Sequence, residues 1–387
     1  MFKIQTLNKI SNTGLDLFPR EDYEIASEIL NPDAILLRSF KMHDMELPPS
    51  LKAVARAGAG VNNIPIDKCS QQGIVVFNTP GANANGVKEL TITGLFLASR
   101  GIVDGIMWAK SLVGKGADVP KLIEKNKSNY AGGEIVGKKL GVVGLGAIGV
   151  SVANAAIALG MEVTGYDPSI SVEAAWGLSR SVQRASSLES LLAESDFVTL
   201  HVPLLEKTKG MINRDKFVLM KKGVCILNFA RGGLVNNEDL KQAINDGIVD
   251  VYITDFPDEE LLKMDKVIPV PHLGASTQEA EDNCAVMAVN QLRNYLEHGT
   301  LKNSVNFPDC QLQRTASKRI VIGNENVPAM VGQITAVLAE EKINIAEMLN
   351  RSKGKLAYNI IDFEGELSEQ SMEKIRKIDG LIMARVL

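Results

Sequence analysis

The stretch Gly141-Val-Val-Gly144-Leu-Gly146-Ala-Ile-Gly149 decides the fold of this chain. An apolar run before it predicts a β-strand, and the apolar residues 147–159 after it predict a helix. A GxGxxG pattern between strand and helix is typical of a dinucleotide-binding turn. Gly144 permits the tight turn, Gly146 lets a pyrophosphate approach the backbone, and Gly149 lets helix and strand pack closely.

Asp167 stands 23 residues after Gly144, at the end of the next predicted strand. A carboxylate there accepts hydrogen bonds from the adenosine ribose hydroxyls and repels a 2′-phosphate, so the pattern favours NAD over NADP. In a chain with 33 glycines, three of them can also form a simple turn by chance. Strand, helix and acid together favour cofactor binding.

Short β-branched runs alternate with helical stretches on both sides of this motif, which predicts parallel sheets. The first series has predicted strands at residues 2–7, 34–38, 53–57 and 74–78. The second has six, at residues 140–143, 162–166, 197–201, 224–228, 251–254 and 267–270. Six parallel strands with helices between them predict a doubly wound, Rossmann-type sheet.

A long helix is predicted at residues 87–102, and three other helices have recognisable ends. One of the three, at residues 147–159, stops at Gly160. Ser186 with Glu189 predicts a capping box, and Ser276 with Glu279 predicts another, which starts a helix running to His298.

A change of composition follows. Residues 303–318 are polar and irregular and are interpreted as a linker. Beyond them the pattern predicts βαββαβ, a separate domain. Its elements are strand 319–322, helix 329–341 with Pro328 at its start, a strand near 344, strand 356–363, helix 369–378 and strand 381–386.

The composition excludes several classes of protein. With 387 residues, 45% hydrophobic and 23% charged, the chain is typical of a soluble globular protein of two to four domains. A net charge of -4 without a basic stripe argues against nucleic acid or a membrane as partner. The four cysteines form no CxxC pair, so neither a metal site nor a disulfide framework is expected. No signal segment is recognised, and a cytoplasmic location is expected.

Hydride transfer to or from a hydroxy acid needs a proton-exchanging group and a cation. His272 follows a short apolar run and precedes a capped helix, so we expect it to face a cleft. Arg231 directly follows another predicted strand, and Glu259 is a carboxylate able to stabilise a charged His272. For His201, a place beside the cofactor and a packed strand-end role both stay open.

These residues occur within motifs that resemble the D-isomer-specific 2-hydroxyacid dehydrogenases over residues 30–305. The motifs are GLGAIG, Asp167, HVPL at 201–204, NFARGGLVN at 228–236, DFPDEE at 255–260 and PHLGAST at 271–277. The resemblance implies a Rossmann domain at residues 88–282 inserted in a flavodoxin-like substrate domain, 1–87 with a return helix at 283–305. It implies Arg231, Glu259 and His272 as catalytic residues. It implies NAD contacts from Gly144, Gly146, Ala147, Ile148, Gly149, Asp167, His201, Pro203, Ala230, Asp255 and Gly274.

One departure from the family concerns Asp255. Most members read Asp-Val-Phe before the glutamate, whereas this chain reads Thr254-Asp255-Phe256, so the role of Asp255 is left open. Two other functions also stay open. The same triad serves reductases of glyoxylate, hydroxypyruvate or other 2-keto acids, and a dehydrogenase fold also serves non-catalytic, NAD-sensing corepressors.

Residues at strand ends bear on the substrate. Arg38, Ser39, Gly60, Asn83 and Lys88 offer positive charges and backbone N–H groups to a phosphorylated hydroxy acid. From the residues alone, two other roles are equally consistent with the sequence: Arg38 is an ordinary surface ion, and Lys88 is a charge on the face of a helix. The Leu-Arg-Ser and asparagine-rich loops resemble those of family members that oxidise 3-phosphoglycerate toward serine, which implies that substrate.

The C-terminal residues 318–387, after a linker at 306–317, resemble the ACT regulatory domain. That resemblance implies serine as an effector bound by Asn326 and Asn344, although Asn324 replaces a histidine used in some serine-inhibited members. A purely dimerising ACT domain is the alternative. The length matches the shorter members of the family, and a homodimer or homotetramer is expected.

Overall fold

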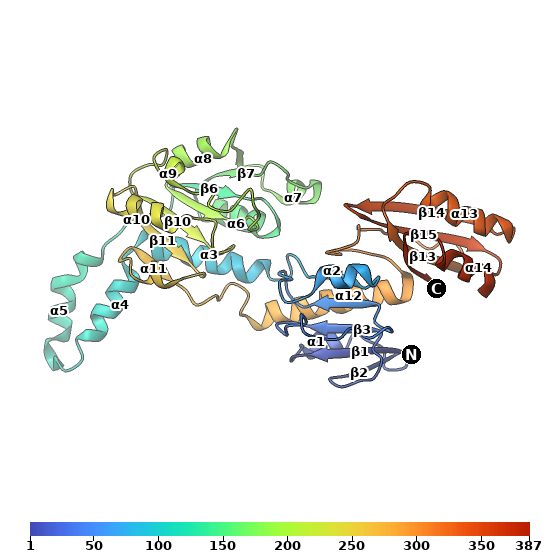
Figure 1. Ribbon diagram of the computed structural model, residues 1–387. Coiled ribbons are helices and arrows are strands. Elements are labelled where there is room, and N and C mark those ends of the chain that lie inside the picture. Colours follow the sequence, from blue (N-terminus) through green and yellow to red (C-terminus); the bar gives the residue numbers. More distant parts are fainter. The chain divides into compact units, whose positions relative to one another are not determined.

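The computed structural model describes all 387 residues, which form two compact units. One consists of Met1–Ala82 with Glu281–Leu387, and the other of Asn83–Ala280 (Figure 1). The middle of the chain is therefore inserted between the two parts of the first unit. We call these the outer unit and the inserted unit.

The inserted unit contains a seven-stranded sheet in the order β12-β11-β10-β9-β6-β7-β8. All its strand pairs are parallel, and the strands are β6 Lys139–Val143, β7 Glu162–Tyr166, β8 Gln183–Arg184, β9 Phe197–Leu200, β10 Val224–Asn228, β11 Val249–Thr254 and β12 Val267–Pro269. The chain order reverses between β6 and β9, where ligands bind in open α/β sheets. The predicted Rossmann-type sheet is confirmed. The prediction missed β8, because two residues carry no hydrophobic period.

Helices connect these strands. They are α3 Ala84–Ser99, α4 Ile102–Ser111, α5 Val119–Asn126, α6 Ala147–Ala158, α7 Val172–Gly177, α8 Leu188–Glu194, α9 Arg214–Phe217, α10 Asn237–Asn245 and α11 Glu259–Leu262, with 3-10 turns η1 Gly116–Asp118 and η2 Lys127–Tyr130. Helix α3 is shifted by three residues from the predicted helix: it begins at Ala84 rather than 87 and ends at Ser99 rather than 102.

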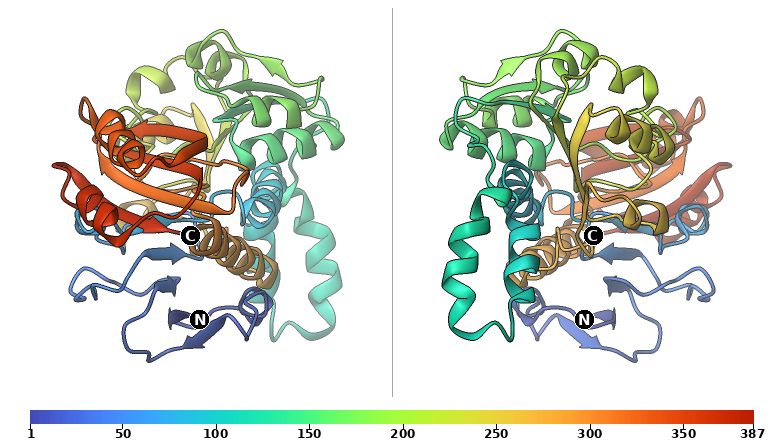
Figure 2. Two further views of the ribbon diagram at one scale, coloured as in Figure 1. Left: turned by 90° about the vertical axis from the view of Figure 1, so that its right-hand side faces the viewer. Right: turned by 90° about the vertical axis from the view of Figure 1, so that its left-hand side faces the viewer.

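Helices α4 and α5 lie side by side as an arm that extends from the body of the inserted unit (Figures 1 and 2). The Trp108 ring stacks on the Tyr130 ring with centroids 5.3 Å apart, which joins α4 to η2. No residue of α4 or α5 is buried. Ile102, Ile106 and Met107 give α4 apolar residues at helical spacing, yet these side chains are exposed, and the sequence analysis did not predict the arm.

The outer unit has a five-stranded parallel sheet in the order β2-β1-β3-β4-β5, which is the flavodoxin-like order. Its elements are β1 Phe2–Leu7, α1 Asn12–Leu15, β2 Tyr23–Ala26, β3 Ala34–Leu37, β4 Ala53–Arg56, α2 Ile66–Gln71, β5 Val75–Phe77 and most of α12 Gln278–His298. The short edge strand β2 was not predicted. Helix α12 packs on the sheet through buried residues such as Ala288 and Leu292.

The C-terminal residues form a four-stranded antiparallel sheet in the order β14-β15-β13-β16. Its elements, β13 Lys318–Glu325, α13 Met330–Glu340, β14 Asn344–Lys353, β15 Leu356–Glu364, α14 Glu369–Arg376 and β16 Leu381–Val386, confirm the predicted βαββαβ order. The fully buried Arg319 and Asp362 form an ion pair at 2.5 Å. The Arg319 guanidinium also donates to the carbonyl oxygen of His298 at 2.9 Å, which ties this sheet to the end of α12.

The segment interpreted as a linker is packed rather than free. The Asn306 side chain accepts a hydrogen bond from the Val76 N–H at 2.9 Å and donates one to the Ile74 carbonyl at 2.9 Å. Phe307 and Cys310 are buried in the core of the outer unit. Side-chain amides replace a regular strand there, a contact that hydrophobic periodicity does not reveal.

Three predicted helix starts are wrong by one residue. The α8 capping box uses Ser187 and Ser190 rather than Ser186 and Glu189. At α12 the Thr277 hydroxyl, not that of Ser276, accepts from the Ala280 N–H, at 3.1 Å. Adjacent serines and threonines make the capping residue ambiguous in sequence. Helix α13 begins at Met330, because Ala329 adopts a left-handed conformation with φ 67°.

Candidate functional site

Three glycines join β6 to α6, and each meets a different environment. Gly144 has φ 91°, and a Cβ added there would lie 2.6 Å from the His201 carbonyl oxygen. A Cβ added at Gly149 would lie 1.9 Å from the Gly144 carbonyl oxygen. A Cβ added at Gly146 would meet no protein atom within 4 Å. The fold therefore requires glycine at positions 144 and 149, while the space above Gly146 is open to a ligand at the N-terminus of α6.

Asp167 follows β7 and holds the glycine loop. Its carboxylate accepts hydrogen bonds from the Leu145 N–H and the Ser169 N–H, each at 2.8 Å. Each carboxylate oxygen has a second acceptor site, so two ribose hydroxyls can still be bound there. The predicted acid therefore stands at the end of the strand next to the glycine loop, as a ribose contact requires.

His201 follows β9, at the reversal of strand order. Its Nε2 lies 3.0 Å from the Thr199 hydroxyl, and its Nδ1 is buried with no hydrogen-bond partner. Burial lowers the pKa of His201 to about 3, so the ring is neutral at pH 7. An unpaired buried nitrogen at this place fits a residue that borders a cofactor, just before Pro203.

The turn after β10 positions Arg231. The buried Asn228 side chain accepts from the Ala230 N–H at 3.2 Å and the Arg231 N–H at 3.4 Å, and it donates to the Arg231 carbonyl at 2.9 Å. The Arg231 side chain is exposed, and its guanidinium donates to the Ala230 carbonyl at 2.7 Å without forming an ion pair. Its charge is therefore available to an anion.

Asp255 is the buried carboxylate of this region. It is 2% exposed, its Oδ2 accepts from the Gly274 N–H at 3.2 Å, and its Oδ1 has no hydrogen-bond partner. Burial raises the pKa of this carboxyl, while the Gly274 N–H and the nearby His272 and Arg231 oppose the rise. One carboxylate thus lies within electrostatic reach of both predicted catalytic cations.

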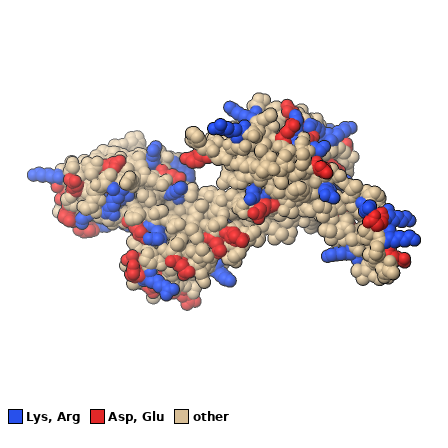
Figure 3. Space-filling model, turned by 180° about the vertical axis from the view of Figure 1, so that it is seen from behind, with Lys and Arg blue, Asp and Glu red and all other residues tan.

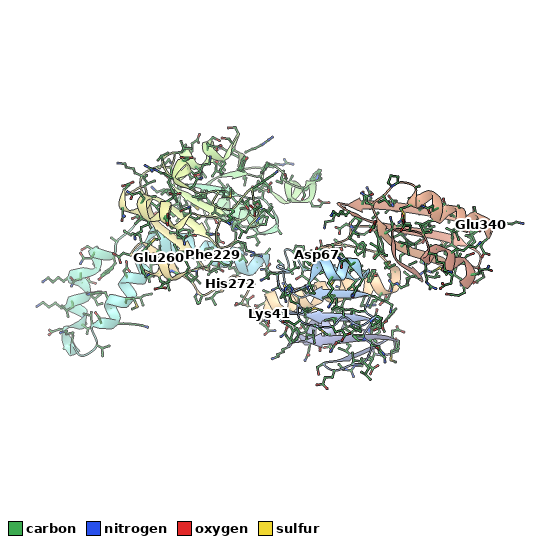
Figure 4. All side chains as sticks on the ribbon, viewed as in Figure 1. Lys41, Asp67, Phe229, Glu260, His272 and Glu340 are labelled. Atoms are coloured by element: carbon green, nitrogen blue, oxygen red, sulfur yellow. The ribbon has the colours of Figure 1, made fainter.

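His272 occupies a strained turn after β12, at the edge of the sheet where β10, β11 and β12 end in register (Figure 4). Its φ of 50° is uncommon for a residue other than glycine. The ring packs on Phe256 with centroids 4.7 Å apart and is exposed. The turn presents the imidazole to solvent while the Phe256 ring limits its orientation.

Glu259 lies outside this group. It is the first residue of α11, its side chain is 85% exposed, and its carboxylate pairs with Lys263 at 3.2 Å. It forms no hydrogen bond or ion pair with His272, so the structure does not show the predicted partnership. The structure brings together Arg231, Asp255 and His272 instead. The unusual order Thr254-Asp255 was the only signal in the sequence for this arrangement.

The predicted substrate residues are divided between the units. In the outer unit, the Asn8 side chain accepts from the Ser39 N–H at 3.0 Å, which shapes the loop after Arg38. The Arg56 Nε donates to the Arg38 carbonyl at 2.8 Å, and its Nη1 donates to the Gly60 carbonyl. Sequence analysis missed Asn8 and Arg56. The place of Arg56 at the end of β4, before a glycine-rich loop, was the available signal.

Two predicted substrate residues belong to the inserted unit. Asn83 precedes α3, and its side chain makes no capping hydrogen bond. The Lys88 ammonium donates to the Asn85 side-chain oxygen at 2.6 Å and lies 3.8 Å from the Glu89 carboxylate. The charge of Lys88 is thus partly neutralised on its own helix.

The two predicted regulatory asparagines do not meet within one chain. Asn344 is paired with Glu364, at one end of β15. Asn326 directly follows Glu325, which is paired with Leu356 at the other end of β15. The length of β15 separates them by roughly 25 Å. A single ligand bound by both asparagines would therefore need two copies of the chain.

Charges of both signs are mixed over the face shown in Figure 3, without a continuous basic band. No single helix is long and apolar enough to cross a membrane; the bent pair α3 and α4 passes that test together, with an angle of 70° between them.

The glycine loop, the acid after β7 and the strand order define a dinucleotide-binding dehydrogenase fold. Residues 101–274 match the family model of the D-isomer specific 2-hydroxyacid dehydrogenase NAD binding domain. Together with the full-length relative described next, this match shows that the chain belongs to the D-isomer-specific 2-hydroxyacid dehydrogenase family, and it confirms NAD as the predicted cofactor.

Its relatives include two enzymes named D-3-phosphoglycerate dehydrogenase. The chain is 32% identical to that of Haemophilus influenzae, over 99% of this chain and 94% of the relative. It is 32% identical to that of Methanocaldococcus jannaschii, over 93% of this chain but only 65% of that relative. The solved NAD+-bound 3-phosphoglycerate dehydrogenase of Entamoeba histolytica is 26% identical, with a TM-score of 0.61, covering 79% of this chain and 98% of that one.

Proposed function

We propose that the protein oxidises D-3-phosphoglycerate at C2 to 3-phosphohydroxypyruvate with NAD, the first step of L-serine synthesis. The observation that carries this proposal is the similarity to the Haemophilus influenzae enzyme over nearly the whole of both chains. The arrangement of Arg231, Asp255 and His272 supports it, because these groups supply the acid-base and electrostatic functions of hydroxy-acid oxidation.

The residues present fit NAD. The open space above Gly146 suits a pyrophosphate, Asp167 retains acceptor sites for the ribose, and the unpaired Nδ1 of His201 lies at the strand reversal. When bound, NAD supplies the acceptor for the hydride that leaves C2. Further residues complete the proposed cofactor contacts: Ala147 and Ile148 after β6, Pro203 after β9, Ala230 after β10 and Gly274 after β12.

In this mechanism His272 accepts the proton of the C2 hydroxyl. Arg231 binds the substrate carboxylate and stabilises the negative charge that develops on the C2 oxygen as it becomes a carbonyl. A carboxylate near His272 stabilises the imidazolium that results. Asp255 is the group that the geometry supports for this role, whereas family resemblance implies Glu259. Paired substitution of the two acids decides between them.

The phosphate of the substrate requires cations, which the proposal assigns to Arg38 and Lys88. Ser39, Gly60 and Asn83 would add hydrogen bonds from the loops beside them. We expect Arg38→Ala and Lys88→Ala to raise KM for phosphoglycerate and to leave KM for an unphosphorylated 2-keto acid nearly unchanged. An unchanged KM for phosphoglycerate in both variants would contradict the phosphate assignment.

One assay tests the proposed function. NADH formation from phosphoglycerate and NAD is measured beside NADH consumption with glyoxylate and with hydroxypyruvate. We expect the highest kcat/KM with phosphoglycerate and its keto product. A preference for unphosphorylated acids would make the protein a reductase of the same family. Binding of NAD without turnover of any substrate would make it a non-catalytic NAD sensor.

Regulation by serine is part of the proposal. Because Asn326 and Asn344 lie at opposite ends of the C-terminal sheet, serine bound by both would join two chains. We expect a homodimer or homotetramer in sedimentation experiments and inhibition of turnover by serine. If Asn326→Ala and Asn344→Ala leave inhibition unchanged, the effector binds elsewhere. Oligomers without any response to serine would leave only a dimerising role for this domain.

A further inference from the structure

Arg38 forms an ion pair with Glu281 in the outer unit. The Nη1 of Arg38 lies 2.5 Å from the Glu281 carboxylate, and the two side chains are 39% and 40% exposed. Arg38 follows β3, and Glu281 stands in the first turn of α12. The helix that returns the chain to the outer unit thus places a carboxylate on the arginine that the proposed function assigns to the substrate.

The surroundings of this pair are positively charged. Arg56, at the end of β4, donates its Nε hydrogen to the Arg38 carbonyl, so the two arginines occupy adjacent strand ends. Cys284, one turn after Glu281, is within electrostatic reach of Arg38, Arg56 and Glu281. Glu281 therefore pairs with one arginine, Arg38, and a second arginine, Arg56, contacts the Arg38 main chain from the next strand end; the carboxyl ends of parallel strands such as β3 and β4 are where ligands bind.

We propose that Glu281 is an internal competitor for the substrate, which pairs with Arg38 and is displaced from it by the dianionic phosphate. This inference rests on the proposed function for the identity of the substrate. Both side chains are partly exposed, so Glu281 can rotate into water when it leaves. Glu281 acts through Arg38 and touches no reacting atom, so it is not a catalytic residue.

The difference in charge between a phosphate group and a carboxylate explains why the substrate can displace Glu281 from Arg38. A phosphate monoester carries nearly two negative charges at pH 7 and three acceptor oxygens, whereas a carboxylate carries one charge and two oxygens. A phosphate group can therefore displace Glu281 from Arg38. A singly charged group has no such advantage over the Glu281 carboxylate in binding Arg38. Glu281 thus lowers the affinity of Arg38 for any anion by a modest factor, and the dianionic phosphate binds strongly enough to displace it.

The test is Glu281→Gln in the full-length protein, with Glu279→Gln as the matched control. Glu279 lies two positions earlier on the same helix, is exposed and forms no ion pair. Because positions i and i+2 do not share a helix face, Glu279 does not face Arg38 as Glu281 does. We expect Glu281→Gln to lower KM for phosphoglycerate about two- to fivefold, the range for loss of an exposed ion pair, with kcat unchanged. KM for glyoxylate should stay constant, and Glu279→Gln should change neither KM.

Arg38→Ala gives a second control. If Glu281 acts through Arg38, adding Glu281→Gln to Arg38→Ala should not change KM for phosphoglycerate any further. An unchanged or raised KM in Glu281→Gln would overturn the inference, a raised value meaning that Glu281 orients Arg38 instead. Calorimetric titration with inorganic phosphate repeats the comparison without turnover. Tighter phosphate binding by Glu281→Gln in a protein that does not oxidise phosphoglycerate would support the competition and reject only the proposed function.

Discussion

The Asp255 carboxylate accepts a hydrogen bond from the main-chain N–H of Gly274 at 3.2 Å, two residues beyond His272. This bond joins the turn after β11 to the turn that carries the imidazole. Asp255 lies within electrostatic reach of His272 and Arg231, both of which oppose the rise that burial causes in its pKa. The consequences of this relationship are open to measurement.

Replacement of Asp255 by Asn removes that charge and keeps the shape of the side chain. We expect kcat to fall at least about tenfold, because the imidazolium loses its stabilising carboxylate. Glu259→Gln is the matched comparison. A larger loss in Glu259→Gln would show that Glu259 is the partner of His272 during turnover.

His272→Ala should lower kcat about 100-fold or more, the usual effect of losing a general acid-base. NAD affinity, measured by fluorescence titration, should stay within about twofold, because all the proposed cofactor contacts except Gly274 lie in other turns. Retention of full turnover would exclude His272 from proton transfer.

The glycine loop provides a matched pair of substitutions. Gly146→Ala places a methyl group in open space, so we expect an unchanged melting temperature but NAD binding weakened more than about tenfold. Gly149→Ala forces a Cβ to within 1.9 Å of a backbone oxygen and should destabilise the fold by about 1–3 kcal/mol or more. Normal NAD affinity in Gly146→Ala would mean that the pyrophosphate does not pass over this residue.

Asp167→Ala should weaken NAD binding and improve the use of NADP, because the acid that binds the ribose hydroxyls also repels a 2′-phosphate. The same change removes acceptors from the Leu145 and Ser169 N–H groups. Thermal melting must therefore accompany the measurement. An unchanged ratio of NAD to NADP affinity in a folded variant would contradict the ribose contact.

The pH dependence of stability tests the burial of His201. Its pKa is about 3 in the folded protein against 6.5 for an unburied ring, so the unfolded chain binds more protons between these values. The contribution of His201 to stability is complete above pH 6.5 and decreases as pH falls toward 3, by at most about 1.4 kcal/mol per pH unit. His201→Gln should lose stability less steeply over this range, as measured by urea unfolding. Equal slopes in the two proteins would show that the ring is solvated.

Much of the architecture could be predicted because it depends on local rules. Strand and helix periods, the strand-glycine-helix motif and the βαββαβ order are properties of short stretches. Strand β8 was missed because it is two residues long and has no hydrophobic period. Helices α4 and α5 were missed although α4 has apolar residues at helical spacing, and neither helix buries a side chain. Capping residues were misplaced by one position because neighbouring hydroxyl side chains are chemically equivalent.

The sequence alone determined the fold class, the three glycines with Asp167, and the order of Arg231 and His272 along the chain. Only the tertiary structure shows that Asp255, and not Glu259, lies within electrostatic reach of His272, because successive residues after a strand face opposite sides and a shift of one position exchanges Thr254 for Asp255. It also separated Asn326 from Asn344 and paired Arg38 with Glu281. Such contacts join residues far apart in the chain, and they depend on strand register and helix placement that no local pattern encodes.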